Sequence, residues 1–434
     1  MSQNRLVQIR YGRTGLALRV PAEAAVLTGA QAPGLARSAD AIRTTLKQPI
    51  GSAPLMDLLT RRRPKSVAIT ISDITRPVPN ALILPVLLET LNAAGVPDQA
   101  VTIIVGTGMH RPSTPAEQLE LVGPEILRRC AVVDHRADDP TTLTKVADHP
   151  PVAVNTQFMR ADFRIVTGLI EPHFMAGYSG GRKGVCPALV DLATVQRFHG
   201  PAILSDARSA SGRLAGNPCH AESLRVARLV GIDFLLNVAI NQARELAAVY
   251  AGDMEAAHEA GVREVAEWTS ARVEKPFDLV ITSGGGYPLD QTFYQAVKGM
   301  VAALPACHKR STILIAAECG EGIGSESYRQ VMQNWSGDWR GFLAHIAQTP
   351  TVSKDQWQAQ MQARVLAKIG TERLWLACDA LPLEQQRCLW VTPVPGDATA
   401  AERSQRAVDR YLADHPDARI GVIPDGPYTM LQAG

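Results

Sequence analysis

The sequence predicts an α/β protein made of two doubly wound, Rossmann-like domains that face each other across a cleft. At 434 residues the chain is longer than one ordinary hydrophobic core accommodates, so two domains are expected. Short apolar runs rich in β-branched residues alternate with helical patterns in both halves of the chain. Such runs are typical of parallel sheets that helices cover on both faces.

The N-terminal half opens with a hairpin pattern and continues as strands alternating with helices. Two strand-like runs, residues 6–11 and 16–20, flank a Gly-Arg-Thr-Gly turn. Further on, apolar runs predict strands, and a helical spacing of Leu and Ile predicts helices. The predicted strands are residues 67–71, 101–105, 130–133 and 163–167, and the predicted helices are residues 81–94 and 115–129.

A polar, proline-containing stretch at residues 268–276 interrupts this rhythm and predicts the connection between the domains. We therefore expect an N-terminal α/β domain over residues 1–270 and a C-terminal α/β domain over residues 271–434. Closure about the connection would bring the second domain over a ligand held by the first. The strands predicted for the second domain are residues 278–282, 312–316, 374–377, 389–391 and 420–423.

The composition excludes several classes of protein. The 44 basic residues nearly balance the 42 acidic ones, which argues against binding to nucleic acid or to a membrane surface. No apolar run approaches the roughly 20 residues that span a bilayer, and the N-terminus lacks the apolar core of a signal peptide. The 7 cysteines form no CxxC pair. We expect a cytoplasmic protein with reduced thiols.

Residues 168–199 carry the densest set of chemically useful side chains and follow a predicted strand. His173, a glycine-rich turn containing Lys183, and His199 fall within this stretch. Glycines let the backbone approach a ligand closely, the lysine presents an amine, and histidines bind metals or move protons. The pattern favours a bound anionic or aromatic cofactor, with or without a metal. The alternative is a flexible connection whose histidines only pack.

Three further strands also end in polar stretches that contain Gly or Pro. In open parallel sheets the carboxyl ends of the strands form the ligand-binding edge, so several such stretches together indicate a site. Each stretch alone is weak evidence, because these residues also end ordinary strands. The three stretches are Ser72–Pro77, Gly106–Pro112 and Thr282–Gln291.

Individual side chains in these stretches have both a functional and a structural interpretation. Arg76 offers a planar fork for carboxylate or phosphate, or a surface salt bridge. His110 is either a proton acceptor or a packed structural histidine. Lys298 follows Tyr294 by four residues and Gln295 by three, so a helix would direct all three to one side. That side is either a carboxylate-binding surface or an ordinary polar exterior.

The distance between Lys183 and His199 depends on where the intervening helix begins. One straight helix from Pro187 to His199 would carry the histidine about 18 Å along its axis. Asp191 is a suitable N-cap, and a helix that begins there would bring the two side chains closer together.

Taken together, these motifs resemble those of the nickel-pincer lactate racemase family, which comprises 2-hydroxyacid racemases and epimerases. The resemblance extends from residue 72 to residue 298, and residues after about 325 carry no matching motif. The motifs are Ser72–Pro77, Gly106–Arg111, Glu171–His173, Tyr178–Lys183, His199, Gly285–Asp290 and Tyr294–Lys298.

The resemblance implies a role for each matching residue, with the active site in the cleft between the domains. Lys183 would hold a pyridinium bis(thiocarboxylate) mononucleotide covalently, and His199 would ligate its nickel. His110 and His173 would be the paired acid and base. The implied cofactor contacts are Asp73, Ile74, Thr75, Arg76 and Ser179, and the implied substrate contacts are Arg76, Tyr294, Gln295, Lys298 and Trp357.

The implied activity is inversion of the C2 carbon of a 2-hydroxyacid by reversible, proton-coupled hydride transfer. Removing hydride avoids a carbanion beside a carboxylate, and an electron-poor metallated pyridinium is a suitable acceptor. A neutral histidine takes the hydroxyl proton. The implied partners are a small-molecule acid and the biosynthetic enzymes that supply the cofactor.

Three alternatives remain at this point. The same chemistry would serve a 2-epimerase of a longer sugar acid, such as an aldonate. A phosphate- or nucleotide-binding α/β protein would use Lys183 in an anion-binding turn, although residues 178–183 match neither GxxxxGK[ST] nor GxGxxG. A non-catalytic scaffold or sensor would bind nickel and substrate without turnover.

Overall fold

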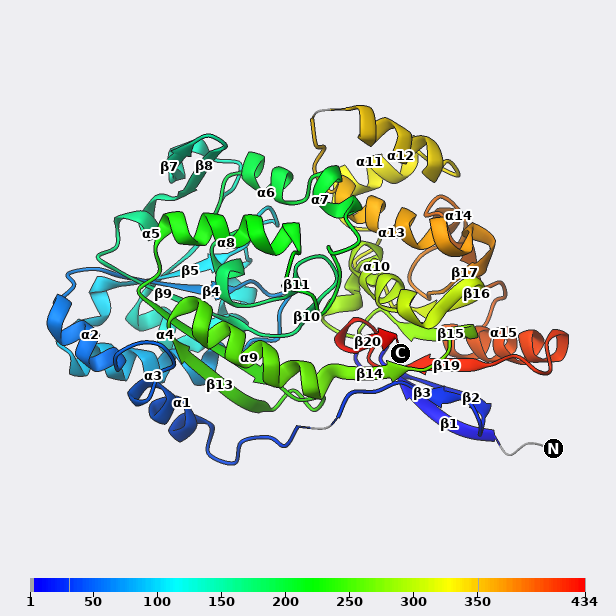
Figure 1. Cartoon of the computed structure of the whole chain (residues 1–434), viewed down its shortest axis with the longest axis horizontal. Coiled ribbons are helices and arrows are strands. Elements are labelled where there is room, and N and C mark those ends of the chain that lie inside the picture. Colours follow the sequence, from blue (N-terminus) through cyan, green and yellow to red (C-terminus); the bar gives the residue numbers. More distant parts are fainter. Residues whose placement is uncertain (1–3, 31, 350, 434) are drawn as a thin grey trace.

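The protein consists of two lobes, each built around a six-stranded sheet, as the computed structural model shows (Figure 1). The structure describes residues 4–30, 32–349 and 351–433. The predicted α/β fold with two Rossmann-like units is confirmed. Within the described residues, no helix combines the length and apolar character needed to cross a membrane.

The first sheet has the strand order β13-β12-β9-β4-β5-β6, in which only the β12–β13 pair is antiparallel. Its central strands have both faces buried, which explains why they appear in the sequence as continuous apolar runs. The predicted strands are confirmed to within two residues, whereas β12 and β13 were not predicted. The strands are β4 (Val67–Ser72), β5 (Val101–Gly106), β6 (Ala131–Asp134), β9 (Phe163–Leu169), β12 (Phe234–Ile240) and β13 (Leu246–Gly252).

Helices cover both faces of this sheet, as a doubly wound fold requires. One face packs against α1 (Ser38–Lys47), α2 (Leu55–Arg62), α3 (Asn80–Ala93) and α4 (Pro115–Arg129). The other face packs against α5 (Thr156–Arg160), α6 (Leu192–Phe198), α8 (Pro218–Val230) and α9 (Met254–Thr269), and the short α7 (Pro201–Ser205) contacts α8. The predicted helices 81–94 and 115–129 correspond to α3 and α4.

The second sheet is parallel throughout, with the strand order β18-β17-β16-β15-β19-β3. Its strands are β3 (Ala25–Val26), β15 (Phe277–Ser283), β16 (Cys307–Ala316), β17 (Leu374–Ala377), β18 (Thr392–Pro393) and β19 (Ile420–Ile423). The strand predicted at residues 389–391 is wrong, because Trp390 has a φ of 53° that an extended chain does not adopt. The strand begins only at Thr392.

The two faces of the second sheet are covered differently. One face packs against α10 (Phe293–Ala302) and α13 (Gln356–Ile369), and α11 (Glu326–Asn334) and α12 (Trp339–Gln348) pack on α13. The other face packs against α15 (Ala400–Asp414) and the hairpin of β1 (Asn4–Ile9) and β2 (Leu16–Pro21). The short α14 (Leu383–Arg387) precedes β18. The hairpin predicted around the Gly-Arg-Thr-Gly turn is confirmed.

Residues 4–26 lie with the second lobe. The hairpin packs on the second sheet, and β3 forms the edge of that sheet beside β19 (Figure 1). The expected domain of residues 1–270 therefore needs correction at its N-terminal end, because residues 4–26 pack with the C-terminal unit. The sequence pattern of a hairpin predicts that its two strands pair with each other. It does not predict the sheet on which the hairpin packs.

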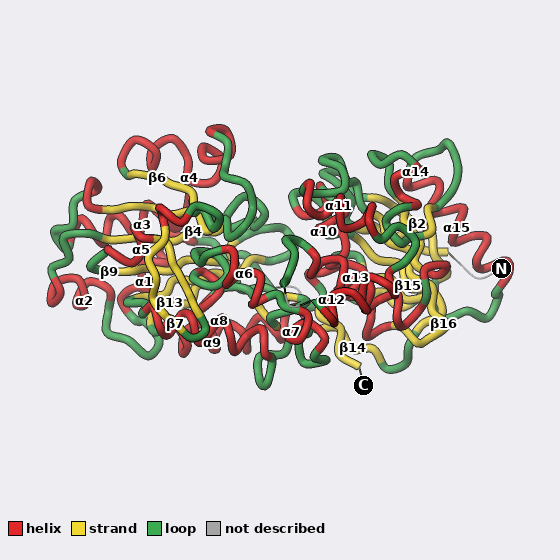
Figure 2. Tube along the Cα trace, turned by 90° about the horizontal axis from the view of Figure 1, so that it is seen from above, coloured by secondary structure: helices red, strands yellow, loops and turns green. Residues whose placement is uncertain are grey.

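The chain crosses between the lobes twice, after β3 and after α9. The two crossings touch, since a β-carbon at Gly29 would collide with the carbonyl oxygen of Trp268. Beyond the second crossing, β14 (Ser270–Val273) pairs with β20 (Met430–Ala433). Seen from above, the two lobes lie side by side and meet in the middle of the molecule (Figure 2).

Two small hairpins lie outside the two large sheets. One is formed by β7 (Leu143–Asp148) with β8 (Pro151–Asn155), and the other by β10 (Pro172–His173) with β11 (Gly177–Tyr178).

Candidate active site

A cavity of about 160 Å³ lies between the lobes, at the carboxyl ends of β4, β5 and β9 and beside α10 and α13. It gathers nearly all of the predicted site residues, although they lie far apart in the sequence. Ile74 is the exception, because it lines an outer cavity of about 650 Å³ that adjoins the first. The predicted residues that line the inner cavity are Asp73, Thr75, Arg76, His110, His173, Ser179, Lys183, His199, Tyr294, Gln295, Lys298 and Trp357.

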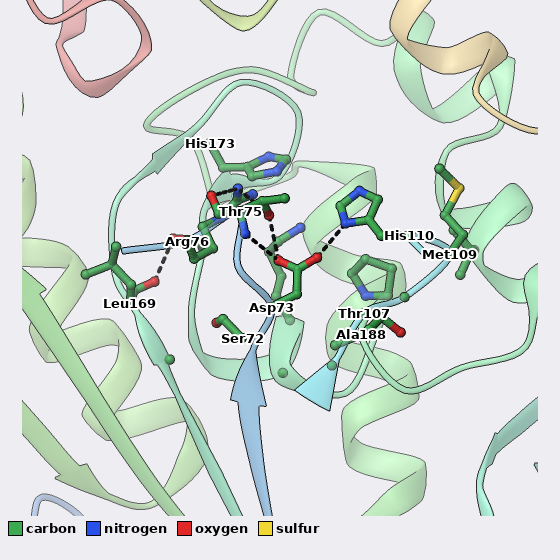
Figure 3. Close-up of a pocket in the computed structure, with 18 of the residues that line it drawn as sticks. Ser72, Asp73, Thr75, Arg76, Thr107, Met109, His110, Leu169, His173 and Ala188 are labelled. Atoms are coloured by element: carbon green, nitrogen blue, oxygen red, sulfur yellow. Dashed lines mark hydrogen bonds and ion pairs between the residues drawn. The ribbon is translucent and has the colours of Figure 1, made fainter. Parts of the chain in front are cut away.

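His110 forms a hydrogen-bonded pair with a buried carboxylate (Figure 3). Its Nδ1 lies 2.6 Å from Oδ2 of Asp73, whose other oxygen accepts the Thr75 hydroxyl at 2.6 Å. Burial raises the pKa of Asp73, but the charge and hydrogen bond of His110, aided by Thr75 and Arg76, outweigh it and lower the pKa to about 2. The ionised carboxylate therefore accepts a hydrogen bond from the Nδ1–H group of His110. The other ring nitrogen, Nε2, is left to face the cavity.

His173 is held by backbone amides of its own loop. Its Nδ1 accepts the N–H groups of Met175 at 3.3 Å and Ala176 at 3.1 Å. Burial, together with the positive charges of Lys183, Arg76 and Lys298, lowers the pKa of His173 well below its ordinary value. The ring is therefore neutral at physiological pH.

Lys183 extends into the cavity from a tight turn, the 3₁₀ segment Gly181–Gly184. Gly181 has a φ of 54°, and a β-carbon there would lie 2.6 Å from the His258 ring, so the turn requires glycine. Burial, with the nearby charges of Arg182 and Arg76, lowers the pKa of Lys183 to about 7. A substantial fraction of this amine is neutral and nucleophilic near pH 7.

His199 ends α6, whose N-cap is Asp191, as predicted. The helix is consequently short and brings His199 to the same cavity as Lys183. The Nδ1–H group donates to the carbonyl of Val195 at 2.8 Å, so Nε2 is the free ring nitrogen. Burial lowers the pKa of His199 to about 3, which keeps the ring neutral, the form that binds metals. Among the described residues, no group of three or more His, Cys, Asp or Glu side chains is placed to hold a metal ion.

Glu171 pairs with a residue of the cavity, and the sequence interpretation did not select its side chain. Its Oε1 lies 3.1 Å from Nε of Arg76. Burial raises the pKa of Glu171, while burial and the Arg76 charge lower the pKa of Lys298 well below its ordinary value. Three basic side chains, Arg76, Lys183 and Lys298, line the cavity together with the carboxylate of Asp73, so an anionic ligand would find basic partners there. The sequence offered one signal for Glu171, which is its position beside Pro172 within a motif that matches the family.

The second lobe contributes one side of α10 and two residues of α13, Trp357 and Gln358. Tyr294, Gln295 and Lys298 all line the cavity, as their helical spacing predicted. Trp357 donates its indole N–H to the Tyr294 hydroxyl at 2.8 Å. In the part of the chain that the structure describes, the buried Oε1 of Gln295 has no hydrogen-bond partner. A buried unpaired acceptor at a cavity wall indicates a ligand that donates to it.

Two family models together match most of the chain. One is described as "Lactate racemase N-terminal domain" and matches residues 11–212. The other is described as "Lactate racemase C-terminal domain" and matches residues 273–430.

Comparison with individual proteins gives the same family as the two family models. The lactate racemase of Thermoanaerobacterium thermosaccharolyticum is 31% identical over 442 residues, covering 98% of this chain and 99% of the relative. The lactate racemase of Lactiplantibacillus plantarum is 36% identical over 332 residues, covering 75% and 77%. The apoprotein structure of the former superimposes with a TM-score of 0.88 at 30% identity, covering 99% of this chain and all of that one. A Thermotoga maritima protein, 18% identical with a TM-score of 0.66, covers 87% of this chain and 97% of its own, and shares the fold.

Two α/β lobes with a polar cavity between them, together with these matches, define an isomerase of the racemase type. The chain belongs to the lactate racemase family. The family inferred from the motifs at residues 72–298 is therefore confirmed.

Proposed function

We propose that this protein inverts the C2 carbon of a 2-hydroxyacid, with lactate as the first substrate to test, by reversible, proton-coupled hydride transfer. The observation that supports the proposal is the convergence of His110, His173, Lys183 and His199 on one cavity between the lobes. The similar proteins of known activity are lactate racemases.

The site residues suit a nickel-pincer nucleotide attached to Lys183, with His199 as the ligand from the protein. The partly neutral amine of Lys183 is suited to an acyl-type bond, and Nε2 of His199 is free. One imidazole from the protein fits a metal whose other donors come from a sulfur- and carbon-bearing cofactor. When bound, this group would supply an electron-poor ring with a soft metal, able to take up and return hydride. Biosynthetic enzymes would supply it.

The remaining side chains would bind and orient the acid. Arg76 and Lys298 would hold its carboxylate, because both basic side chains line the cavity. The unpaired Oε1 of Gln295 would accept a hydrogen bond from a donor on the bound ligand. His110 and His173 would contact the hydroxyl oxygen, and enclosure between two lobes would retain the 2-oxoacid until hydride returns.

A second candidate is a 2-epimerase of a longer polyhydroxy acid. The outer cavity of about 650 Å³ favours it, because this space opens directly beside His110 and is lined by polar groups, including Gln291, Ser325 and Asp355. Lactate would leave that space unused. The same catalytic residues would serve both substrates.

The decisive experiment is production of the protein with and without the cofactor-synthesis enzymes, followed by intact-mass, nickel and chiral product analysis. We expect a covalent adduct and stoichiometric nickel only in the first preparation, and neither in Lys183→Ala. Conversion of L-lactate into racemic lactate supports the racemase, and conversion of an aldonate alone supports the epimerase. An adduct-bearing protein inactive on every 2-hydroxyacid tested contradicts the proposal.

A further inference from the structure

Asp355 immediately precedes α13, a position at which an aspartate usually caps the helix. A capping carboxylate accepts an N–H group of the first turn and so stabilises the helix. Within the described residues, Asp355 forms no side-chain capping bond, and its backbone has a φ of 68°. This left-handed conformation costs stability in a residue other than glycine. Because Asp355 gives up both local sources of stability, we expect its side chain to serve another purpose.

The buried carboxylate of Asp355 lines the outer cavity and receives hydrogen bonds from two hydroxyl groups. The Ser325 hydroxyl accepts the N–H group of Tyr328 at 3.1 Å and donates its own proton to Oδ2 of Asp355. The second hydroxyl is that of Tyr294. Burial raises the pKa of Asp355, whereas the hydrogen bonds from Ser325 and Tyr294 oppose that shift. The carboxylate thus joins the starts of α11 and α13 to a side chain of α10.

The Tyr294 hydroxyl connects this carboxylate to Trp357. Its oxygen accepts the indole N–H group of Trp357 at 2.8 Å. An indole N–H group only donates, so the hydroxyl proton of Tyr294 is left for the carboxylate to accept. The hydrogen bonds therefore run in one direction, from the indole to the hydroxyl and from the hydroxyl to the carboxylate.

The indole at the start of this sequence lies against His199. The two rings stack with centroids 4.6 Å apart and planes inclined by 19°. A tilt of the indole would break its hydrogen bond to Tyr294, and a buried donor without a partner is unfavourable. The plane of the imidazole in the first lobe thus depends on hydrogen bonds within the second lobe.

We infer that Asp355 is a positioning residue, which directs the Tyr294 hydroxyl and thereby holds the Trp357 indole against His199. This inference deepens the proposed function and rests on it in one respect, because His199 is the proposed nickel ligand. It adds to the site a carboxylate of the outer cavity that no sequence motif indicated.

Tyr328 shows that packing of the Tyr294 ring and direction of its hydroxyl are separate tasks. The two rings pack edge to face, with centroids 5.1 Å apart. In the part of the chain that the structure describes, the buried hydroxyl of Tyr328 has no hydrogen-bond partner. Tyr328 therefore packs against the Tyr294 ring, and Asp355 directs the Tyr294 hydroxyl. Tyr328→Phe removes a hydroxyl from the same cluster and is the matched control.

NMR of the apoprotein labelled with ¹⁵N-tryptophan tests the role of Asp355 without any cofactor. The chain has 6 tryptophans, and Trp357→Phe identifies the indole signal of Trp357. Asp355→Gly removes the carboxylate and suits the left-handed backbone, so it retains the fold. We expect the Trp357 signal to shift in this variant and its indole proton to exchange with solvent about tenfold faster.

Two further variants complete the NMR test. Asp355→Asn keeps an acceptor oxygen, so we expect it to restore the wild-type signal, and we expect Tyr328→Phe to leave that signal unchanged. An unchanged Trp357 signal in Asp355→Gly overturns the inference. An equal change in Tyr328→Phe also overturns it, because the cluster would then respond to any loss of a hydrogen-bonding group.

A double variant tests whether Asp355 acts through the Tyr294 hydroxyl. Tyr294→Phe removes the acceptor of the indole N–H group, so we expect it to displace the Trp357 signal by itself. Asp355→Gly should then add nothing in the Tyr294→Phe background. A further change as large as that in the single variant overturns the inference, because Asp355 would act on the indole by another route.

Nickel release from the loaded protein measures the consequence for His199. We expect Asp355→Gly to release nickel about threefold faster than the wild type, and Asp355→Asn to release it at the wild-type rate. A wild-type rate in Asp355→Gly overturns the extension of the inference to His199. A wild-type protein that takes up neither cofactor nor nickel contradicts the proposed function instead, and the apoprotein spectra still decide the role of Asp355.

Discussion

His199 of the first lobe and Trp357 of the second lobe stack against each other, with ring centroids 4.6 Å apart and planes inclined by 19°. The indole is held in turn by Tyr294 through the hydrogen bond at 2.8 Å. The imidazole proposed as the metal ligand is therefore oriented from across the cleft. Partners of this kind around a ligand tune metal affinity.

The stack predicts that Trp357→Ala loses nickel faster than the wild-type protein. Without the indole, the His199 ring is oriented only by its hydrogen bond to the Val195 carbonyl, and we expect a roughly tenfold faster release. Release is measured by transfer of nickel from the loaded protein to a colorimetric chelator. Trp375→Ala, on β17 and away from the cavity, is the matched control. Identical release rates in both variants would show that the stack has no effect on the metal.

Replacement of Asp73 distinguishes tautomer control from cofactor contact. In Asp73→Asn the amide can donate to Nδ1 of His110, which moves the ring proton to Nε2 and removes the base. We expect kcat to fall by about 10²-fold or more, with KM and cofactor content nearly unchanged. A variant that loses the covalent cofactor instead would support the cofactor contact implied by the resemblance. Intact mass and steady-state kinetics on one preparation separate these outcomes.

The depressed pKa of Lys183 predicts a pH-dependent stability of the apoprotein. The amine has a pKa of about 7 when folded and 10.5 ordinarily, so the unfolded chain binds more protons between these values. Stability should therefore rise with pH from about 7 to 10.5, and the penalty is fully present below pH 7. Lys183→Met should raise the Tm at pH 7 by several degrees and flatten the Tm profile between pH 7 and 10. The exposed Lys65→Met is the control, and a Tm difference independent of pH would disprove the explanation.

The turn that carries Lys183 predicts a position-specific effect of a single methyl group. Gly181→Ala adds a β-carbon 2.6 Å from the His258 ring, whereas Gly337, with a φ of 74°, has nothing within 4 Å. Both substitutions share the left-handed backbone penalty, about 1–2 kcal/mol. Only Gly181→Ala adds overpacking, about 1–3 kcal/mol, and displaces the lysine. Urea unfolding should show the difference, and adduct formation should fall only in Gly181→Ala. Equal effects would mean that the turn tolerates the contact.

The sequence predicted the central strands and the cavity residues for a common physical reason. Strands buried on both faces are continuous apolar runs, and their polar ends converge on one edge of the sheet, so Asp73, His110 and His173 could be grouped from their positions alone. Tyr294, Gln295 and Lys298 could be grouped because a helix of known period holds them.

The remaining features depend on tertiary packing that no local pattern records. Trp357 reaches the cavity through packing of α13 on α10, and its place was supported only by the resemblance. The hydrogen-bond partners of His110 and His173 also required the structure, since the same residue types serve as acid, base or donor. Residues 4–26 pair locally as predicted but pack more than 250 residues away in sequence, on strands such as β15.

Because the chain enters and leaves the first lobe at adjoining points, that lobe is an insertion within the second. Gly29 and Trp268 lie against each other where the two linking segments pass. Two adjacent linking segments permit a hinge rotation of one lobe relative to the other but resist twisting. We therefore expect the cleft to open by rotation about one axis. Joining residue 27 to residue 270 by a short linker should yield the second lobe as an independently folding protein, whereas cutting the chain at residue 270 would leave both fragments incomplete.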